Sequence, residues 1–291
     1  MPGSVYERIV EARKALVRAG LPSADAAIDA EVLARHALGW DRARLIAEGR
    51  DPAPAGFDDE FAPMIDRRAR REPVAFITGR REFWGLDFEV SRDVLIPRPE
   101  TELIVEGVCE RRPDRGNVRV IVDVGTGSGC LAVALAREFP AAGVIAVDIS
   151  AAAIRVARRN AARHAVADRI RFVHGDLLEA VDLRADVIVS NPPYVPANVQ
   201  LARDVAHYEP AVALYSGDEG LTAVARLVAS ARARLKDDGL FVFEFGLGQD
   251  DRVRELAVEA GWTVAAIKED LQSIPRVAVL SAVSARRSPV S

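Results

Sequence analysis

The sequence is poor in the residues that build metal centres and disulfide frameworks. It contains two cysteines, Cys109 and Cys130, and four histidines among its 291 residues. Neither residue type recurs at the spacing of a metal-binding motif, so we expect no metal site. The chain also lacks an apolar run of membrane-spanning length, and its N-terminus lacks the pattern of a signal peptide. We therefore expect a cytoplasmic protein without membrane contact.

An excess of positive charge is also absent. The chain has 39 lysines and arginines against 43 acidic residues, which gives a net charge of −4. Proteins that coat nucleic acid are usually strongly basic, so we expect no stable nucleic-acid binding, although a local basic patch is compatible with this balance. The densest basic run is residues 67–71. Such a run is usually the solvated face of a helix, and the alternative is a docking surface for a large polyanionic partner.

The N-terminal quarter of the chain has the pattern of a helical domain. In residues 1–72, apolar side chains recur at helical spacing. Ser23 and Asp41 are the expected N-caps, and Gly20 and Gly39 are the expected stops. This pattern predicts a small helical bundle, which we expect to dock the substrate.

The periodicity changes after this bundle. Residues 73–97 include a strand-like alternation around a central glycine, which predicts a β-hairpin linker between two domains. Residues 98–283 alternate between apolar strand-like runs and helical patterns, which is typical of an α/β domain. The last residues, 284–291, are polar and predict a flexible tail.

A glycine-rich loop follows the first strand of the second domain. A β-branched run at residues 118–124 is followed by the loop and then by a helical pattern at residues 131–138. Glycines at the N-terminus of a helix let the backbone approach a ligand closely. The spacing is G-x-G-x-G, unlike that of nicotinamide enzymes, and no P-loop lysine is present. The expected cofactor-binding residues of this loop are Gly125, Thr126, Gly127, Ser128 and Gly129.

Acidic side chains follow the next two strands. Asp148 ends a strand about twenty residues after the glycines, where a carboxylate can accept hydrogen bonds from both hydroxyls of a ribose. Its alternative role is a charge at the start of the helix that Ser150 caps. Asp176 follows the third strand, where its carboxylate could meet an adenine amino group.

The sequence Asn191-Pro192-Pro193-Tyr194 follows a fourth strand, at residues 186–189. The side-chain carbonyl of Asn191 and the backbone carbonyl of Pro192 can each accept one hydrogen of an incoming amino group. The two prolines hold the loop extended, and Tyr194 offers a ring for stacking. These features predict catalytic roles for Asn191, Pro192 and Tyr194, and a substrate-binding role for all four residues. The alternative is a rigid turn.

The order of these strands and loops resembles that of the S-adenosylmethionine-dependent methyltransferases. Four segments together are similar to the release factor glutamine methyltransferases (the HemK/PrmC type). They are residues 96–102, with the sequence Ile-Pro-Arg-Pro-Glu-Thr-Glu, the glycine loop, the Asn-Pro-Pro-Tyr loop, and residues 208–210, with the sequence Tyr-Glu-Pro. The matching stretches run from about residue 73 to residue 249, and the segment ahead of the glycine loop is the most specific of them.

The resemblance implies an α/β fold with a Rossmann-like sheet of seven strands, the last of them antiparallel. It implies methylation of the glutamine amide in the Gly-Gly-Gln motif of peptide chain release factors, with S-adenosylmethionine as the cofactor. By match, the glycine loop, Asp148, Leu177 and Asn191 contact the cofactor, and Asn191 to Tyr194 hold the glutamine. An aromatic residue would be more usual at position 177. We expect a monomer.

Two other interpretations fit parts of the sequence. An amino group of a DNA or RNA base presents the same geometry as the glutamine amide, and the base would be flipped into the pocket. The acidic balance and the lack of a basic, aromatic-rich recognition domain argue against this substrate. A noncatalytic cofactor-binding protein is the other interpretation, and the intact glycine and Asn-Pro-Pro-Tyr loops argue against it.

Overall fold

The computed structural model describes residues 3–282, so the predicted tail at residues 284–291 lies outside the described residues. The chain divides into two compact units. The helical unit comprises the residues up to Arg80 together with Leu201–Tyr208, and the sheet unit comprises Arg81–Gln200 and the residues from Glu209 onward. We call Leu201–Tyr208 the return segment. It lies within the predicted second domain, so the chain enters the helical unit twice, where the sequence predicts a single passage.

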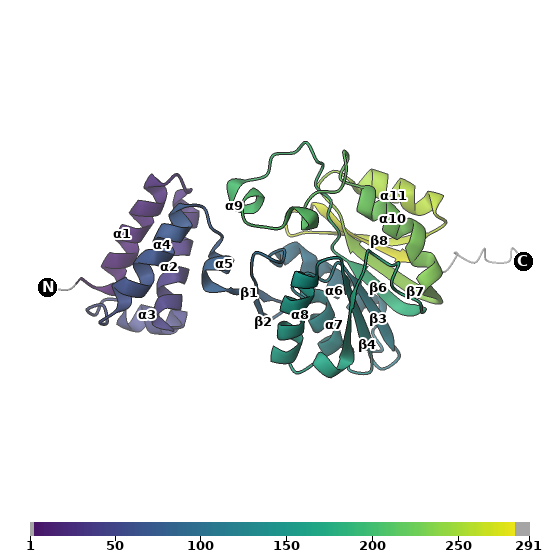
Figure 1. Ribbon diagram of the computed structural model, residues 1–291, viewed down its shortest axis with the longest axis horizontal. Coiled ribbons are helices and arrows are strands. Elements are labelled where there is room, and N and C mark those ends of the chain that lie inside the picture. Colours follow the sequence, from purple (N-terminus) through teal and green to yellow (C-terminus); the bar gives the residue numbers. More distant parts are fainter. Residues whose placement is uncertain (1–2, 283–291) are drawn as a thin grey trace, which may run out of the picture. The chain divides into compact units, whose positions relative to one another are not determined.

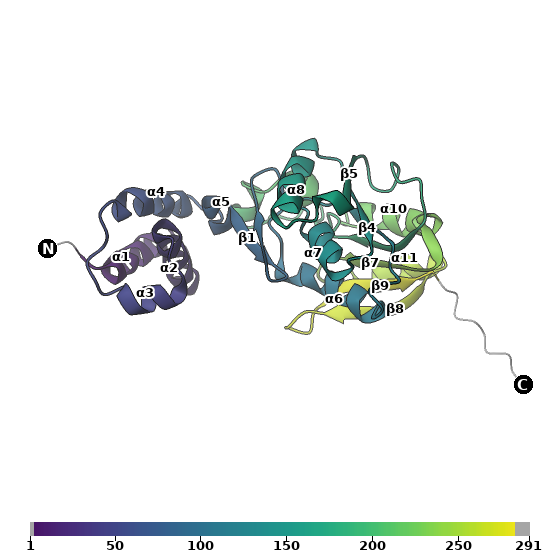
Figure 2. The same ribbon diagram turned by 90° about the horizontal axis from the view of Figure 1, so that it is seen from below.

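The helical unit consists of short helices around one apolar core (Figures 1 and 2). Leu16, Leu33 and Leu45 are fully buried in this core, and the rings of Phe57 and Phe61 stack at 4.9 Å. The helices are α1 (Val5–Arg18), α2 (Ser23–Leu38), α3 (Arg42–Glu48), α4 (Phe57–Ala69), α5 (Val74–Thr78) and, in the return segment, α9 (Arg203–Ala206).

The ends of these helices match the predicted signals at three positions out of four. Gly20 follows Ala19, the C-cap of α1, with a φ angle of 87°. Asp41 caps α3 by accepting a hydrogen bond from the backbone N–H of Arg44, and Gly39 ends α2 in the left-handed conformation. Ser23 is the first residue of α2 and not its N-cap, because Pro22 occupies the cap position without a side-chain hydrogen bond. Proline is common just before or at the first helical turn, since the N–H that it lacks has no partner there.

The predicted hairpin consists of β1 (Arg80–Phe83) and β2 (Leu86–Glu89). Trp84 and Gly85 form its two-residue turn, and both have positive φ angles, of 54° and 69°. Two-residue turns of this hand match the twist of the strands that they join. The helix α5 occupies the beginning of the predicted 73–97 linker, so the hairpin is shorter than that range.

The sheet unit is built on seven strands in the order β5-β4-β3-β6-β7-β9-β8. The strands from β3 to β7 are parallel, whereas β9 is antiparallel to both β7 and β8. The predicted fold class is confirmed. The strands are β3 (Val120–Val124), β4 (Gly143–Asp148), β5 (Ile170–His174), β6 (Ala185–Ser190), β7 (Leu235–Glu244), β8 (Thr263–Glu269) and β9 (Pro275–Ser281).

Helices cover both faces of the sheet (Figures 1 and 2). Ile121 on β3 packs with α6, α7 and α8, and the next residue, Val122, packs with α10 and α11. This alternation follows from the period of two in a strand. The helices are α6 (Glu102–Arg111), α7 (Cys130–Glu138), α8 (Ala151–Arg163), α10 (Thr222–Ala231) and α11 (Asp250–Glu259). Short 3-10 helices occur at Pro99–Thr101, Ala167–Arg169, Ala211–Ala213 and Arg232–Arg234.

The strand order reverses at β3. From β3 the chain moves outward through β4 to β5 and then returns to the other side of β3 as β6. Parallel α/β sheets bind ligands at the carboxyl ends of the strands where the order reverses. The loops that follow β3, β4 and β6 therefore meet at the expected binding edge. Within residues 3–282, no helix has both the length and the apolar character needed to span a membrane.

Candidate active site

The glycine loop connects β3 to α7 with three glycines in positive-φ conformations. The φ angles of Gly125, Gly127 and Gly129 are 71°, 54° and 81°. The backbone N–H groups of Gly125 and Thr126 donate hydrogen bonds of 2.8 and 2.9 Å to the carbonyl of Val147 on the neighbouring strand. A Cβ atom on Gly129 would lie only 3.0 Å from the Cβ of Ala157, so helix α8 packs directly against the loop. These φ angles, hydrogen bonds and contacts fix the backbone conformation of the glycine loop.

A buried aspartate supports the loop from beneath. Asp123 accepts hydrogen bonds from the hydroxyl of Thr126 (2.6 Å) and the backbone N–H of Ala132 (3.1 Å) through one oxygen, Oδ2. Its other oxygen, Oδ1, is buried and has no hydrogen-bond partner in the part of the chain that the structure describes. Burial raises the pKa of Asp123 to about 7, because an uncompensated buried charge is costly.

Asp148 closes the loop at the end of β4. Its Oδ2 accepts a 2.8 Å hydrogen bond from the N–H of Gly127, and its Oδ1 accepts a 2.8 Å hydrogen bond from the N–H of Ser150. Burial raises the pKa of this carboxyl group, and the two backbone donors oppose that rise. Asp148 therefore lies where both predicted roles are possible. It lines the cavity, and it also stabilises the start of the helix that Ser150 caps. Each carboxylate oxygen keeps a further lone pair for a ligand hydroxyl.

A relay of hydrogen bonds orients Asn191. Its side-chain Nδ2 donates to Thr101 Oγ1 at 2.9 Å, and the Thr101 hydroxyl donates to Glu244 Oε2 at 2.6 Å. The other oxygen of Glu244 accepts a 2.9 Å hydrogen bond from the hydroxyl of Tyr194. Because the Thr101 proton goes to the carboxylate, its oxygen is an acceptor toward Asn191, which fixes the amide with nitrogen toward Thr101.

The consequence of the relay is a side-chain carbonyl that is left open. Among residues 3–282, none donates a hydrogen bond to Asn191 Oδ1, and Asn191 lines the cavity. Glu244 is 1% exposed at the end of β7, and burial raises its pKa. Burial and the adjacent Glu244 carboxylate also raise the pKa of Tyr194, so its hydroxyl stays a donor. Sequence reasoning missed Glu244 and the link that it makes.

A second carboxylate joins two of the segments that carry the family resemblance. Glu209 accepts a 2.9 Å hydrogen bond from the backbone N–H of Ile96 and pairs with the Arg98 guanidinium at 2.5 Å. The Glu209 side chain is almost completely buried. It therefore fixes the loop ahead of the glycine loop to the chain that follows the return segment.

These loops enclose a cavity of about 370 Å³. Of the predicted site residues, those at its wall are Gly125, Thr126, Gly127, Ser128, Asp148, Asp176, Leu177, Asn191 and Pro193. Gly129, Pro192 and Tyr194 are outside its lining. Tyr194 instead supports the loop through Glu244, which differs from the stacking surface that the sequence suggests.

Two further residues of the cavity wall, Asp176 and Cys130, differ in their charge and in their contacts. Asp176 pairs with the Arg226 guanidinium at 2.7 Å, so one of its oxygens is already engaged in this structure. Cys130, at the start of α7, is buried, and burial raises the pKa of its thiol to about 12. The cavity wall therefore includes the carboxylates of Asp148 and Asp176, the thiol of Cys130 and the open carbonyl of Asn191.

Comparisons with known proteins agree with this arrangement. Residues 100–208 match the family model "Methyltransferase small domain", and residues 7–79 match the "PrmC N-terminal domain". The hMettl16 catalytic domain, solved with a MAT2A 3′UTR hairpin, is 18% identical with a TM-score of 0.58 over 76% of this chain and 83% of that chain. This likeness shows a shared fold.

Curated relatives match most of the chain at higher identity. The release factor glutamine methyltransferase of Xylella fastidiosa (strain Temecula1) is 43% identical over 254 residues, which cover 87% of this chain and 92% of the relative. The enzyme of the same name from Burkholderia pseudomallei is 42% identical over 86% of this chain and 90% of the relative. The resemblance drawn from the sequence is confirmed: the chain belongs to the release factor glutamine methyltransferase family.

Proposed function

We propose that this protein transfers a methyl group from S-adenosylmethionine to the side-chain amide nitrogen of the glutamine in the Gly-Gly-Gln motif of peptide chain release factors. Family membership supports this assignment. The observation that carries it is the orientation of Asn191, whose Nδ2 is held by Thr101 so that its Oδ1 is an open acceptor at the cavity wall.

The residues of the cavity fit the cofactor. A volume of about 370 Å³ lies within the range of cofactor pockets. A Cβ atom on Gly127 would have no described neighbour closer than 3.9 Å, and within residues 3–282 the buried Ser128 hydroxyl has no hydrogen-bond partner. Asp148 keeps acceptor capacity for the ribose hydroxyls. When bound, S-adenosylmethionine supplies an electrophilic methyl group on a positively charged sulfur.

The side chains of the site then need only hold and orient the amide. Asn191 Oδ1 accepts one hydrogen of the glutamine –NH₂ group, and the backbone carbonyl of Pro192 accepts the other. An amide nitrogen is a weak nucleophile because its lone pair is delocalised, and fixing both hydrogens favours the geometry that it needs for in-line attack. No strong base is required before transfer, since the proton can leave afterwards. Glu244 is not that base, because both of its oxygens are engaged by hydroxyl groups.

The helical unit is proposed to dock the release factor. All residues that line the cavity belong to the sheet unit. Residues 7–79, which make up most of the helical unit, match the family model of the PrmC N-terminal domain. This unit also carries exposed apolar side chains, including Ile28 and Ile46, which are 63% and 67% exposed. Because release factors work in translation, a cytoplasmic location is part of this proposal.

Mass spectrometry tests the function directly. A purified release factor is incubated with the protein and S-adenosylmethionine, and a gain of one methyl group is mapped to a residue. Methylation of the Gly-Gly-Gln glutamine is expected, and Asn191→Ala should remove it while cofactor binding persists. Transfer to DNA or RNA with none to the release factor would overturn the proposal.

A further inference from the structure

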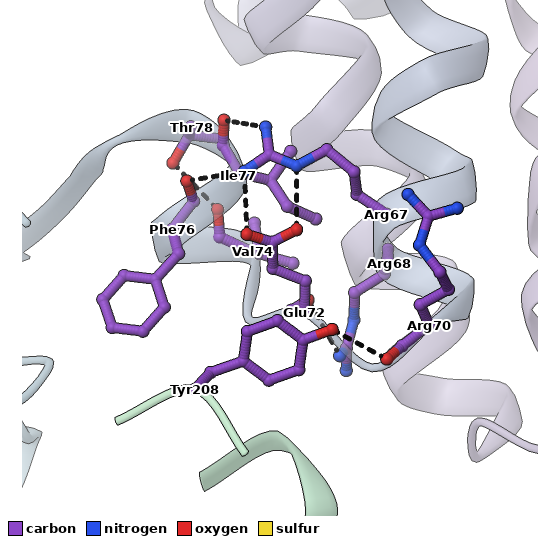
Figure 3. Close-up of polar contacts among 9 residues, drawn as sticks. All are labelled: Arg67, Arg68, Arg70, Glu72, Val74, Phe76, Ile77, Thr78 and Tyr208. Carbon is purple, nitrogen blue, oxygen red and sulfur yellow. Dashed lines mark hydrogen bonds and ion pairs between the residues drawn. The ribbon is translucent and has the colours of Figure 1, made fainter. Parts of the chain in front are cut away.

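Three arginines of the basic run at residues 67–71 bind groups within the helical unit, whereas Arg70 is exposed. Arg67 pairs with Glu72 through two hydrogen bonds of 2.8 and 2.9 Å, as Figure 3 shows. Arg68 is 8% exposed and forms two ion pairs, with Asp29 of α2 at 2.6 Å and with Asp204 of α9 at 2.7 Å. Arg71 donates to the carbonyl of Gly20. Arg67, Arg68 and Arg71 therefore act inside the helical unit.

Arg68 holds together two parts of the chain that are far apart in sequence. Asp29 lies in the first part of the helical unit, and Asp204 lies in the return segment, 136 residues beyond Arg68. The hydroxyl of Tyr208 adds a second attachment, a 3.0 Å hydrogen bond to the backbone carbonyl of Arg70 (Figure 3). The return segment is thus bound to the rest of the helical unit at its middle, through Asp204, and at its C-terminal end, through Tyr208.

The return segment is the tip of a loop whose base belongs to the active site. Val195, which directly follows the Asn-Pro-Pro-Tyr sequence, donates to the carbonyl of Leu214 and accepts from the N–H of Ser216, both at 2.9 Å. Ala197 donates to the carbonyl of Gly217, also at 2.9 Å. These bonds close the base of the loop within the sheet unit.

The loop passes from one unit to the other between adjacent anchored residues. Tyr208 is bound to Arg70 in the helical unit, and Glu209 is bound to Ile96 and Arg98 in the sheet unit. Consecutive Cα atoms are about 3.8 Å apart, so this connection has almost no slack. The return segment is therefore joined directly to the anchored chain that continues to Pro210 at the cavity wall.

We propose that Arg68 and Asp204 are positioning residues for the methylation of a docked release factor. Their ion pair attaches the return segment to the rest of the helical unit. A release factor that docks on the helical unit is then connected, through a short stretch of the polypeptide chain, to the loop that binds the glutamine. The inference rests on the proposed function. The Glu209 anchor separates the pair from the cofactor cavity, so the ion pair should influence presentation of the protein substrate and not cofactor binding.

The two partners of Arg68 provide a matched pair of variants. Asp204→Asn weakens the hold on the return segment and leaves the pair between Arg68 and Asp29 in place. Asp29→Asn removes the other ion pair of the same arginine and leaves the return segment attached. Both variants keep side-chain size, and they avoid Arg68→Ala, which would leave two carboxylates without their partner and could unfold the helical unit.

Steady-state methylation of a whole release factor is measured for both variants, with the folded protein counted by its S-adenosylmethionine-binding stoichiometry. We expect Asp204→Asn to lower kcat by about tenfold or more, as a displaced substrate does, with unchanged cofactor affinity. Asp29→Asn should keep kcat within about twofold of the wild type. Equal losses in both variants, or wild-type kcat in Asp204→Asn, would overturn the inference. Failure of the wild-type protein to methylate the release factor would instead refute the proposed function.

Discussion

The side chain of Asn191 is oriented by Thr101, a residue 90 positions earlier in the chain, through a hydrogen bond of 2.9 Å. Thr101 lies in the segment at residues 96–102, and its hydroxyl group donates its proton to the buried carboxylate of Glu244. Three segments of the chain thus meet at one amide group. The proposed grip on the substrate depends on a carboxylate that does not line the cavity.

Replacing Glu244 by glutamine should disturb the direction of this relay. A carboxylate accepts from both Thr101 and Tyr194, whereas an amide has one acceptor oxygen and a donor group. If the new –NH₂ group faces Thr101, the threonine proton turns toward Asn191 and the asparagine amide reverses, which removes its open carbonyl. We expect kcat to fall by about tenfold to a hundredfold with little change in cofactor affinity. Steady-state kinetics and calorimetric titration of S-adenosylmethionine check this result.

Tyr194→Phe is the matched control for the Glu244 variant. It removes one donor to Glu244 and leaves the path from Glu244 through Thr101 to Asn191 intact. A smaller loss of kcat than in Glu244→Gln is expected. A Tyr194→Phe loss as large as that of Glu244→Gln would show that the hydroxyl of Tyr194 matters more than the relay.

Thr101→Val should separate the contribution of the Thr101 hydroxyl group from the contribution of its side-chain shape. Valine fills the same volume but leaves the amide nitrogen of Asn191 without its acceptor, and an unmet hydrogen bond of this kind costs about 1–3 kcal/mol. Lower kcat and a lower melting temperature are expected. Thr101→Ser keeps the hydroxyl and should recover most of the turnover. If serine were no better than valine, the packing of the methyl group would explain the defect.

Asp148→Asn should weaken cofactor binding more than turnover of the bound complex. The carboxylate accepts from the backbone N–H groups of Gly127 and Ser150, and an asparagine would turn its –NH₂ group toward one of these donors. The glycine loop would then lose a contact, and the ribose would lose an acceptor. An increase of about tenfold or more in Kd, equal to about 1.4 kcal/mol, is expected by calorimetry. An unchanged Kd would contradict the proposed ribose contact.

Asp123 should make the protein less stable as the pH rises toward neutrality. Burial raises its pKa to about 7 from the 3.8 of an exposed aspartate, so between these values the folded state binds a proton that the unfolded state has lost. The contribution of this group to the free energy of unfolding is therefore present at low pH and is lost as the pH rises through about 7. Asp123→Asn cannot titrate and should flatten this slope.

Denaturant unfolding at several pH values between about 4 and about 8 measures the effect. The difference in unfolding free energy between Asp123→Asn and the wild type should grow in favour of the variant as the pH rises. A constant difference across this range would show that the carboxyl group titrates normally in the folded protein. The asparagine carbonyl can replace Oδ2 as acceptor for Thr126 and Ala132, so the loop itself should persist.

The strands and loops of the site could be predicted because their signals are local. The glycines at 125, 127 and 129 predict a loop with positive φ angles. Asp148 and Asn191 each come at the end of an apolar run, and both runs end at the same edge of a parallel sheet. In the same way, the spacing of apolar residues, with period two in strands and helical period in helices, predicts the order of strands and helices along the sheet unit. The seven-stranded arrangement needed the family resemblance as well.

The relay and the Arg68 pairs could not be predicted, because they join residues far apart in the chain. Thr101 and Glu244 are 143 positions apart, and Arg68 and Asp204 are 136 positions apart. One signal was present for Glu244, a single acidic residue within the apolar run at residues 240–245, which in a buried strand requires hydrogen-bonding partners. The arginine run offered no such clue, since buried and solvated arginines look alike in sequence.

The buried thiol of Cys130 has a practical consequence for handling the protein. A thiol with a pKa of about 12 remains almost wholly protonated near neutral pH, whereas alkylating reagents and peroxide attack the thiolate. Cys130 is also only 9% exposed, at the wall of the cavity. We therefore expect alkylating reagents to modify Cys130 much more slowly than an exposed cysteine.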